Sequence, residues 1–341
     1  MKITGQLKTL LPTAFGLALL ILDGRTAVEG ARSGLEVCLQ SVLPSLFPFI
    51  FLSSILTTSL LSGDFKGCRI LCRLYGIPQG TEGILLTGLI GGYPVGAKCI
   101  GEAVSRGQLF TAEAERMLVF CNAAGPAFIF GILGSIFPQP WIPWCLWGIH
   151  LLSGLYMARL QPYATWRVSS NNSVSNHSVT QRLRQSVVVM GEICGWIILM
   201  RTGIAFAKKW GLQYLPKPFE VFVTGILELT NGCLMLSAVE NTGLRFLICS
   251  ALLSFGGLCV ALQTSSVSSG VRQRHYFPRK CIQAIFSFLV AYIVQYLFFD
   301  VAQKVHLPWL FFAALSVCSG IYIYSRAKQK KSCGNLESLG V

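Results

Sequence analysis

This chain contains a series of apolar runs, each about as long as a membrane-spanning helix. Of its 341 residues, 53% are hydrophobic and 12% are charged, whereas a soluble protein carries about 25% charged residues. That hydrophobic share is enough for roughly eight or nine spans of about 20 residues each. The apolar residues come in long runs rather than in strict alternation, which is typical of helices. The sequence therefore predicts an all-α, polytopic transmembrane protein.

Basic residues outnumber acidic ones, 28 to 14, which gives a net charge of +14. The basic residues cluster in short loops, as expected for the cytoplasmic side of a membrane protein. No basic helix or aromatic RNA-binding signature accompanies them, so we expect no nucleic-acid partner. Two clusters are expected in the cytoplasm: the loop with Arg272, Arg274, Arg279 and Lys280, and the basic tail 326–341.

The cysteines and histidines form no pattern typical of a metal or catalytic site. None of the thirteen cysteines is in a CxxC motif, and most lie in apolar runs, where we expect reduced thiols. The four histidines are scattered, and no HExxH, GxSxG or Walker motif is present. We expect no metal, no cofactor and no catalytic residue, although an intramembrane protease or lipid-modifying enzyme stays open as an alternative.

A single long polar segment divides the chain into two halves. Residues 159–184 are rich in serine and asparagine and are expected to form a linker. The linker separates an N-terminal transmembrane half, 1–158, from a C-terminal transmembrane half, 185–325.

Several apolar runs contain residues that interrupt helices. Pro44 and Pro48 lie within the run 34–61, where two prolines predict a hairpin that enters the membrane and turns back. The stretch 91–98, GGYPVGAK, predicts a second break, and the stretch 122–126, NAAGP, predicts a third. A small-residue packing face is the alternative for both glycine-containing stretches, and Lys98 could instead extend to the membrane surface.

The second half carries a break of its own in the stretch 225–232, GILELTNG. A carboxylate inside an apolar run is costly, so Glu228 is expected to be protonated, paired or used to couple a cation. Gly88 aligns with Gly225, and Gly125 with Gly257, at similar spacing. This correspondence predicts an internal two-fold repeat, and paired broken helices are typical of transporter binding sites.

These interruptions predict one binding site near the middle of the membrane. A break exposes backbone groups that must be buried in protein or line a wet cavity, and free N–H groups at a half-helix start attract anions. We therefore expect one cavity for a small anion. Its expected residues are Gly91, Gly92, Tyr93, Pro94, Gly96, Lys98, Asn122, Gly125, Glu228, Thr230 and Asn231.

The motifs PSLFPF at 44–49, GGYPVGAK at 91–98 and EAER at 113–116, followed by FCNAAGP at 120–126, resemble the sporulation integral membrane protein YlbJ family. That family is part of the nucleoside-recognition "gate" domain group, and the resemblance covers roughly residues 30–265. It implies a role in spore formation, as a multi-pass protein of the cell membrane or outer forespore membrane of a spore-forming bacterium. It also implies transport of dipicolinic acid, a small aromatic dianion, across the outer forespore membrane. A nucleoside or metabolite permease and a non-transporting assembly factor for spore formation stay open as alternatives.

Overall fold

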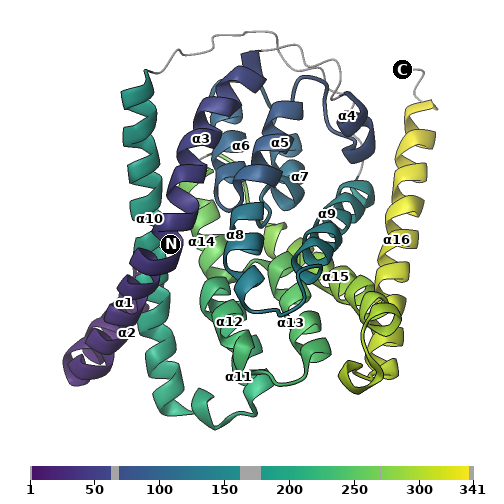
Figure 1. Ribbon diagram of the computed structural model, residues 1–341. Helices are drawn as coiled ribbons and strands as arrows, with labels where there is room; N and C mark the ends of the chain where they lie inside the picture. Colours follow the sequence, from purple (N-terminus) through teal and green to yellow (C-terminus); the bar gives the residue numbers. More distant parts are fainter. Residues whose placement is uncertain (1, 63–68, 162–177, 269, 338–341) are drawn as a thin grey trace.

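The computed structural model describes residues 2–62, 69–161, 178–268 and 270–337, and every regular element in these ranges is a helix (Figure 1). The predicted all-α, polytopic class is confirmed. Six helical segments are long and apolar enough to cross a membrane, fewer than the eight or nine expected, because other apolar runs form short helices. The six segments are Gly24–Leu52, Thr111–Ser135, Val179–Trp210, Thr242–Val267, Tyr276–Phe298 and Pro308–Ser325.

The N-terminal helices pack along one long helix of the second half. A turn at Asp23 separates α1 (Lys2–Leu22) from α2 (Gly24–Val37), and a π-helical turn (Cys38–Val42) leads into α3 (Leu43–Ser62). α10 (Val179–Trp210) runs antiparallel to α2 and α3 along the left edge of Figure 1. Four contacts follow this pairing along its length: Asp23 with Lys209, Ser33 with Arg201, Cys38 with Cys194, and Ser54 with Arg182.

The hairpin predicted at Pro44 and Pro48 is wrong, because the chain continues in one direction from α2 into α3 (Figure 1). In the π-helical turn, the N–H of Leu43 donates to the carbonyl of Cys38, five residues earlier. Pro44 follows this π-helical turn as the second residue of α3. Pro48 stays inside the helix. The prolines thus change the helical register without reversing the chain.

Short helices of the first half fill the upper centre of Figure 1. A paired hairpin, α5 (Glu82–Gly91) and α6 (Val95–Ser105), is followed by an interrupted helix, α7 (Thr111–Cys121) and α8 (Pro126–Gly131). The breaks predicted at 91–94 and 122–126 are therefore confirmed. α4 (Arg69–Tyr75), a 3₁₀ turn (Leu133–Ser135) and the long α9 (Ile142–Leu160) complete this half.

The second half shows the same order of elements, mostly in the lower centre of Figure 1. α11 (Lys217–Leu227) pairs with α12 (Leu229–Met235), and the interrupted helix that follows consists of α13 (Thr242–Phe255) and α14 (Gly257–Val267). The predicted break at Glu228 is confirmed. The internal two-fold repeat stays a prediction. The remaining elements are three 3₁₀ turns (Leu212–Tyr214, Leu236–Ala238 and Val301–Gln303), α15 (Tyr276–Phe298) and α16 (Pro308–Glu337).

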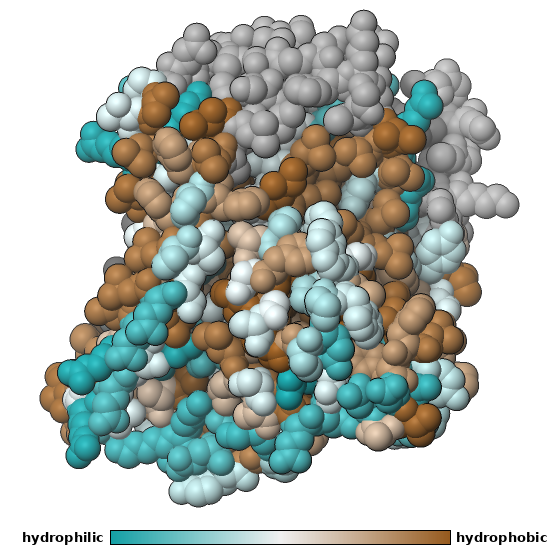
Figure 2. Space-filling view, viewed as in Figure 1, coloured by the Kyte–Doolittle hydropathy of each residue, from teal (hydrophilic) through white to brown (hydrophobic). Residues whose placement is uncertain are grey.

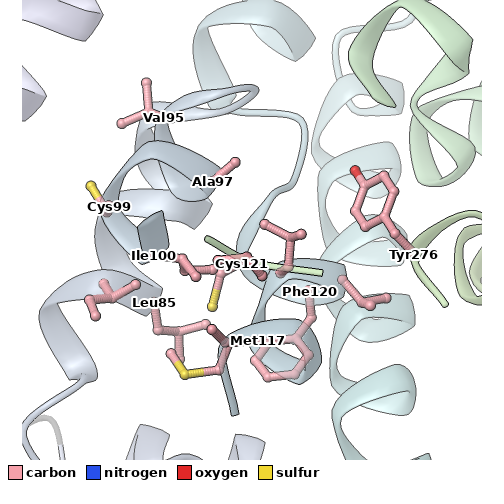
Figure 3. Packing of buried hydrophobic residues seen from close by; sticks show 14 of the residues in the cluster. Leu85, Val95, Ala97, Cys99, Ile100, Met117, Phe120, Cys121 and Tyr276 are labelled. Carbon is pink, nitrogen blue, oxygen red and sulfur yellow. The ribbon is translucent and has the colours of Figure 1, made fainter. Parts of the chain in front are cut away.

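Two buried apolar clusters hold these elements together. In the first, Leu85, Ile100, Met117 and Cys121 pack between α5, α6 and α7 (Figure 3). The second cluster joins α8 and α9 to α11, α13 and α15, around Phe246. Hydrophilic residues gather at the lower edge of Figure 2, over the Asp23 turn and the end of α10, and hydrophobic residues dominate above them. Apolar side chains thus face outward where lipid would surround a membrane protein.

Part of the predicted linker and tail lies in helices. α9 ends at Leu160, and α10 begins at Val179 behind a capping box in which Ser178 and Gln181 bond each other's backbone N–H. Residues 162–177 of the linker 159–184 lie outside the described residues. The basic tail 326–341 continues α16 as far as Glu337.

Candidate functional site

The two interruptions of the first half lie against each other. Residues 92–94 form the turn between α5 and α6, and the Tyr93–Pro94 peptide bond is cis. Gly92 has a φ of +77°, in the left-handed region that favours glycine. A Cβ built on Gly125, in the interruption between α7 and α8, would lie 2.9 Å from the Cα of Gly92. The two backbones therefore meet with no side chain between them.

The interruption of the second half is a single extended residue, Glu228, between α11 and α12. Its carboxylate accepts two hydrogen bonds, from the N–H of Thr230 at 2.8 Å and from the N–H of Asn231 at 2.6 Å. The side chain is only 2% exposed. Glu228 thus caps the start of α12, where the partial positive charge of the helix end stabilises a carboxylate.

A small cavity of about 40 Å³ lies where these interruptions meet. It joins the first and second halves, because Gly92, Tyr93 and Gly125 line it together with Glu228 and Thr230. Such a volume holds about three water molecules. Its other lining residues come from the π-helical turn, α3, α8 and the residue after it, α10, α12 and α14: Val42, Leu46, Phe128, Ile132, Ile193, Ile197, Leu229, Val260 and Gln263. Five of the eleven residues expected at the site thus share one cavity.

Five other expected residues lie at or close to the interruptions without lining the cavity. Gly91 is the last residue of α5, and Pro94 precedes the first residue of α6. A Cβ on Gly96 would lie 2.1 Å from the carbonyl oxygen of Cys121, so this glycine lets α6 pack closely against the end of α7. The N–H of Asn231 bonds Glu228. The fifth residue, Asn122, belongs to a neighbouring polar network.

Lys98 lies in a different place from the one expected. It lines an open groove of about 420 Å³ between α6, α10 and α14. Charged side chains of both signs share this groove with it, namely Glu102, Arg184 and Glu192. None of the residues lining the groove lines the cavity at Gly92 and Glu228. The physical reason is that Lys98 follows the turn at residues 92–94 and lies on α6, which extends away from that turn.

A buried polar network surrounds the interruption between α7 and α8. The Asn122 amide donates to the Thr264 hydroxyl at 2.7 Å and to the Tyr276 hydroxyl at 3.0 Å. His150 Nε2 accepts from the N–H of Ala124 at 2.9 Å. The proton of His150 is therefore on Nδ1, which lies 3.1 Å from the Ser254 hydroxyl. Side chains of α9, α14 and α15 thus bond the Ala124 N–H and the Asn122 amide nitrogen, whereas the Asn122 amide oxygen is buried without a hydrogen-bond partner among the described residues.

Two other residues of this network, Lys280 and Gln283, lie on α15. The Lys280 ammonium donates to the backbone carbonyl of Asn122 and to the Gln283 side-chain oxygen, both at 3.0 Å. The sequence reasoning missed both residues and also His150. Lys280 follows basic loop residues and resembles a cytoplasmic flanking charge, whereas its burial at the break depends on tertiary packing. A lysine, a glutamine and a serine spaced along one face of 280–287 are the signal that could have identified this face.

Tyr93 links the turn between α5 and α6 to the interrupted helix of the second half. Its hydroxyl donates to the carbonyl of Leu253 at 3.1 Å. The face of its ring lies 5.4 Å from the Lys280 nitrogen. Tyr93 therefore contacts the polar network as well as the cavity.

Among the residues that the structure describes, no group of three or more histidine, cysteine or acidic side chains is close enough to hold a metal ion. Eleven cysteines of these ranges are free thiols. The expectation that the chain uses no metal or cofactor stays a prediction.

Comparison with known proteins gives one informative similarity. No protein-family model matches the chain, and no solved structure is similar to it. The chain is 24% identical to the sporulation integral membrane protein YlbJ of Bacillus subtilis (strain 168), over 83% of its own length and 81% of that protein. The similarity extends over both halves and includes most of the region that carries the motifs. Together with the membrane-spanning helices, it supports a relationship of this chain to the YlbJ family of sporulation membrane proteins.

Proposed function

We propose that this protein is a transporter of a small anion in a membrane of the sporulating cell, and that dipicolinate in the outer forespore membrane is its substrate. The observation that carries the proposal is the cavity shared by Gly92, Gly125 and Glu228. Interrupted helices from two halves of a membrane protein meet there, as they do in many transporters. The similarity to a sporulation membrane protein supports the cellular setting.

The cavity is too small for an aromatic dianion, so substrate binding requires the interruptions to separate. The turn between α5 and α6 and the break at Glu228 each connect two short helices. Such helical pairs can move as units when a cavity opens. The groove carries two positive side chains, Lys98 and Arg184, and two negative ones, Glu102 and Glu192. Loss of either positive charge would therefore leave the groove net negative and would repel an approaching anion.

The direct test is uptake of labelled dipicolinate by proteoliposomes. We expect the purified protein to accelerate uptake over protein-free vesicles. Glu228→Ala removes both the cap of α12 and a side chain of the cavity, so it should abolish most of this uptake. Glu240→Ala is the matched control, because Glu240 is an exposed carboxylate twelve positions further along the chain. Equal uptake by both variants at equal reconstitution would contradict a role for the cavity.

A second candidate is a permease for a neutral polar solute such as a nucleoside. The observation in its favour is that the charged side chain lining the cavity is a carboxylate, Glu228, which lies near the Gln263 amide. A negative charge there opposes a second anion, but both groups can hydrogen-bond a neutral solute. Uptake of labelled uridine, with dipicolinate as competitor, separates the two candidates.

A role in spore assembly without transport gives a different result in cells. Spores of a strain that carries Glu228→Ala at normal membrane abundance would then contain normal dipicolinate. We expect instead that their dipicolinate falls to the level of the deletion strain. Normal content in the variant, with reduced content in the deletion strain, would favour the assembly role.

A further inference from the structure

Lys280 is a buried ammonium group with no acidic partner in the described part of the chain. Its side chain is 1% exposed, and it is in none of the ion pairs that the structure shows. An unpaired charge at such a position in a membrane protein is costly, so it is expected to have a function. The surroundings of the ammonium show what that function is.

The carbonyl of Asn122 needs a donor that its own helix cannot supply. In a continuous helix this carbonyl would accept from the residue four positions later, which is Pro126 and has no N–H. α7 ends at Cys121, so the carbonyl of Asn122 lies at the negative end of a helix. The Lys280 ammonium, 3.0 Å away, provides both the donor and the opposite charge.

The other neighbours of the ammonium are also those of a cation site. Gln283 presents its side-chain oxygen at 3.0 Å, and the same amide is held in place by its nitrogen, which donates to Ser153 at 3.2 Å. The ring faces of Tyr93 and Tyr276 lie 5.4 Å and 5.7 Å from the Lys280 nitrogen, within the range of a cation–π interaction. Oxygen atoms and aromatic faces thus surround a single positive charge.

We propose that the Lys280 ammonium is a built-in cation of the break between α7 and α8. It occupies a place where the Asn122 carbonyl at the end of an interrupted helix and the Gln283 side-chain oxygen would otherwise coordinate a mobile monovalent cation such as Na⁺. The protein therefore needs no Na⁺ or K⁺ at this break. Removal of the ammonium opens a site for such an ion between the Asn122 carbonyl and the Gln283 oxygen.

The test compares thermal unfolding of the purified protein in NaCl, KCl and choline chloride at equal ionic strength. The wild-type Tm should be the same in all three salts. Lys280→Ala should lower the Tm in choline, and Na⁺ or K⁺ should restore part of the loss with a saturating dependence on concentration. A tenfold excess of ion over its Kd would raise the Tm by about 2 °C for a chain of 341 residues.

Lys280→Met is the matched control. Methionine fills much of the space of the lysine stem without a charge, so this variant should have a lowered Tm that no cation restores. Lys280→Arg keeps the charge and should show no salt preference.

Three outcomes would overturn the proposal. A wild-type Tm that rises in NaCl relative to choline would show that the lysine does not replace a mobile ion. An alanine variant as stable as wild type in choline would show that the break does not need the charge. Equal responses of the alanine and methionine variants to Na⁺ would show that the ion does not bind in the space that the lysine side chain leaves. The wild-type measurement is decisive even where a variant fails to fold.

One additional measurement rests on the proposed function. Proteoliposomes with wild-type protein should take up dipicolinate equally well in Na⁺ and in choline. Absence of uptake in both media would reject the proposed function, but it would leave the thermal test of Lys280 unaffected.

Discussion

Arg116 and Glu113, three residues apart on α7, form an ion pair of 2.6 Å in which the side chains are 6% and 2% exposed. The Arg116 guanidinium also donates to the backbone carbonyls of Gly76, after α4, and of Ala158, near the end of α9. One buried side chain in the middle of α7 thus connects this helix to the segment after α4 and to the end of α9. Because α7 leads directly to the interruption at Asn122, this pair fixes one side of the candidate site.

Glu113→Ala should destabilise the protein strongly, because it leaves the Arg116 guanidinium buried without its carboxylate. Breaking a buried pair in this way costs about 3–5 kcal/mol. Thermal unfolding in detergent, with membrane abundance as a second readout, measures the effect. Glu29→Ala is the control: Glu29 pairs with Arg25 at 3.0 Å, but both side chains are largely exposed, so no measurable loss is expected. Equal losses in the two variants would contradict a structural role for burial of the Arg116 pair.

Gly125→Ala should prevent the close approach of the two interruptions of the first half. The added methyl group would lie 2.9 Å from the Cα of Gly92 and 2.9 Å from the carbonyl oxygen of Ile90. Overpacking of this kind costs about 1–3 kcal/mol, which unfolding measurements would detect. Gly148→Ala is the control, because Gly148 lies in α9 and a Cβ there meets nothing within 4 Å. A Gly125 variant as stable as the Gly148 variant would show that the backbones can separate freely.

The breaks could be predicted from sequence where the interrupting residues act locally. Gly92 and Pro94 terminate helices through their own backbone properties, and Glu228 stands out as a carboxylate within an apolar run. The prediction failed at Pro44 because the π-helical turn moves the backbone hydrogen bonds by one residue. Nothing in the local sequence distinguishes this accommodation from a reversal of the chain.

The polar partners of the breaks could not be predicted in the same way. Lys280, His150 and Gln283 lie on helices whose sequences are typical of ordinary membrane spans. Lys280 also resembles the basic residues that flank such a span. Their importance depends on contacts with residues 26 to 158 positions away. The position of Lys98 was also mistaken, because its distance from the break depends on how α6 extends along α10 and α14.

Lys98→Ala and Arg184→Ala should each slow anion uptake at low ionic strength without abolishing it. Both side chains line the open groove and not the closed cavity. Loss of either positive charge leaves the groove net negative beside Glu102 and Glu192, and the resulting repulsion of an anion is screened over about 10 Å at 0.1 M salt. Initial uptake rates in low and high salt test this, and the difference from wild type should shrink in high salt. Arg25→Ala, an exposed charge on α2 outside the groove, should leave the rates unchanged at both salt concentrations. A complete loss with Lys98→Ala in both salts would instead place the lysine at the substrate.

An epitope tag inserted after Ser173 should leave membrane insertion and uptake intact. α9 ends at Leu160 and α10 begins at Val179 with its own cap, so both helices have defined ends outside the insertion. A serine- and asparagine-rich composition contributes little to a core. The same tag inserted after Gly92 is the control and should abolish folding, because that turn contacts Gly125. Loss of folding from the Ser173 insertion would contradict the division into two halves.

The cavity at the meeting point of the interruptions also bears on how many copies of the protein a cell needs. A space of about 40 Å³ has no room for an aromatic ring, so under the proposed function each solute moved would require one opening and one closing of the helical pairs. Collective motions of this kind take about microseconds to milliseconds. At the slow end, one molecule would deliver on the order of a thousand solutes per second, far below the flux of an open pore. For a transporter of this kind, the time needed to fill a compartment would depend on the abundance of the protein as well as on the solute gradient.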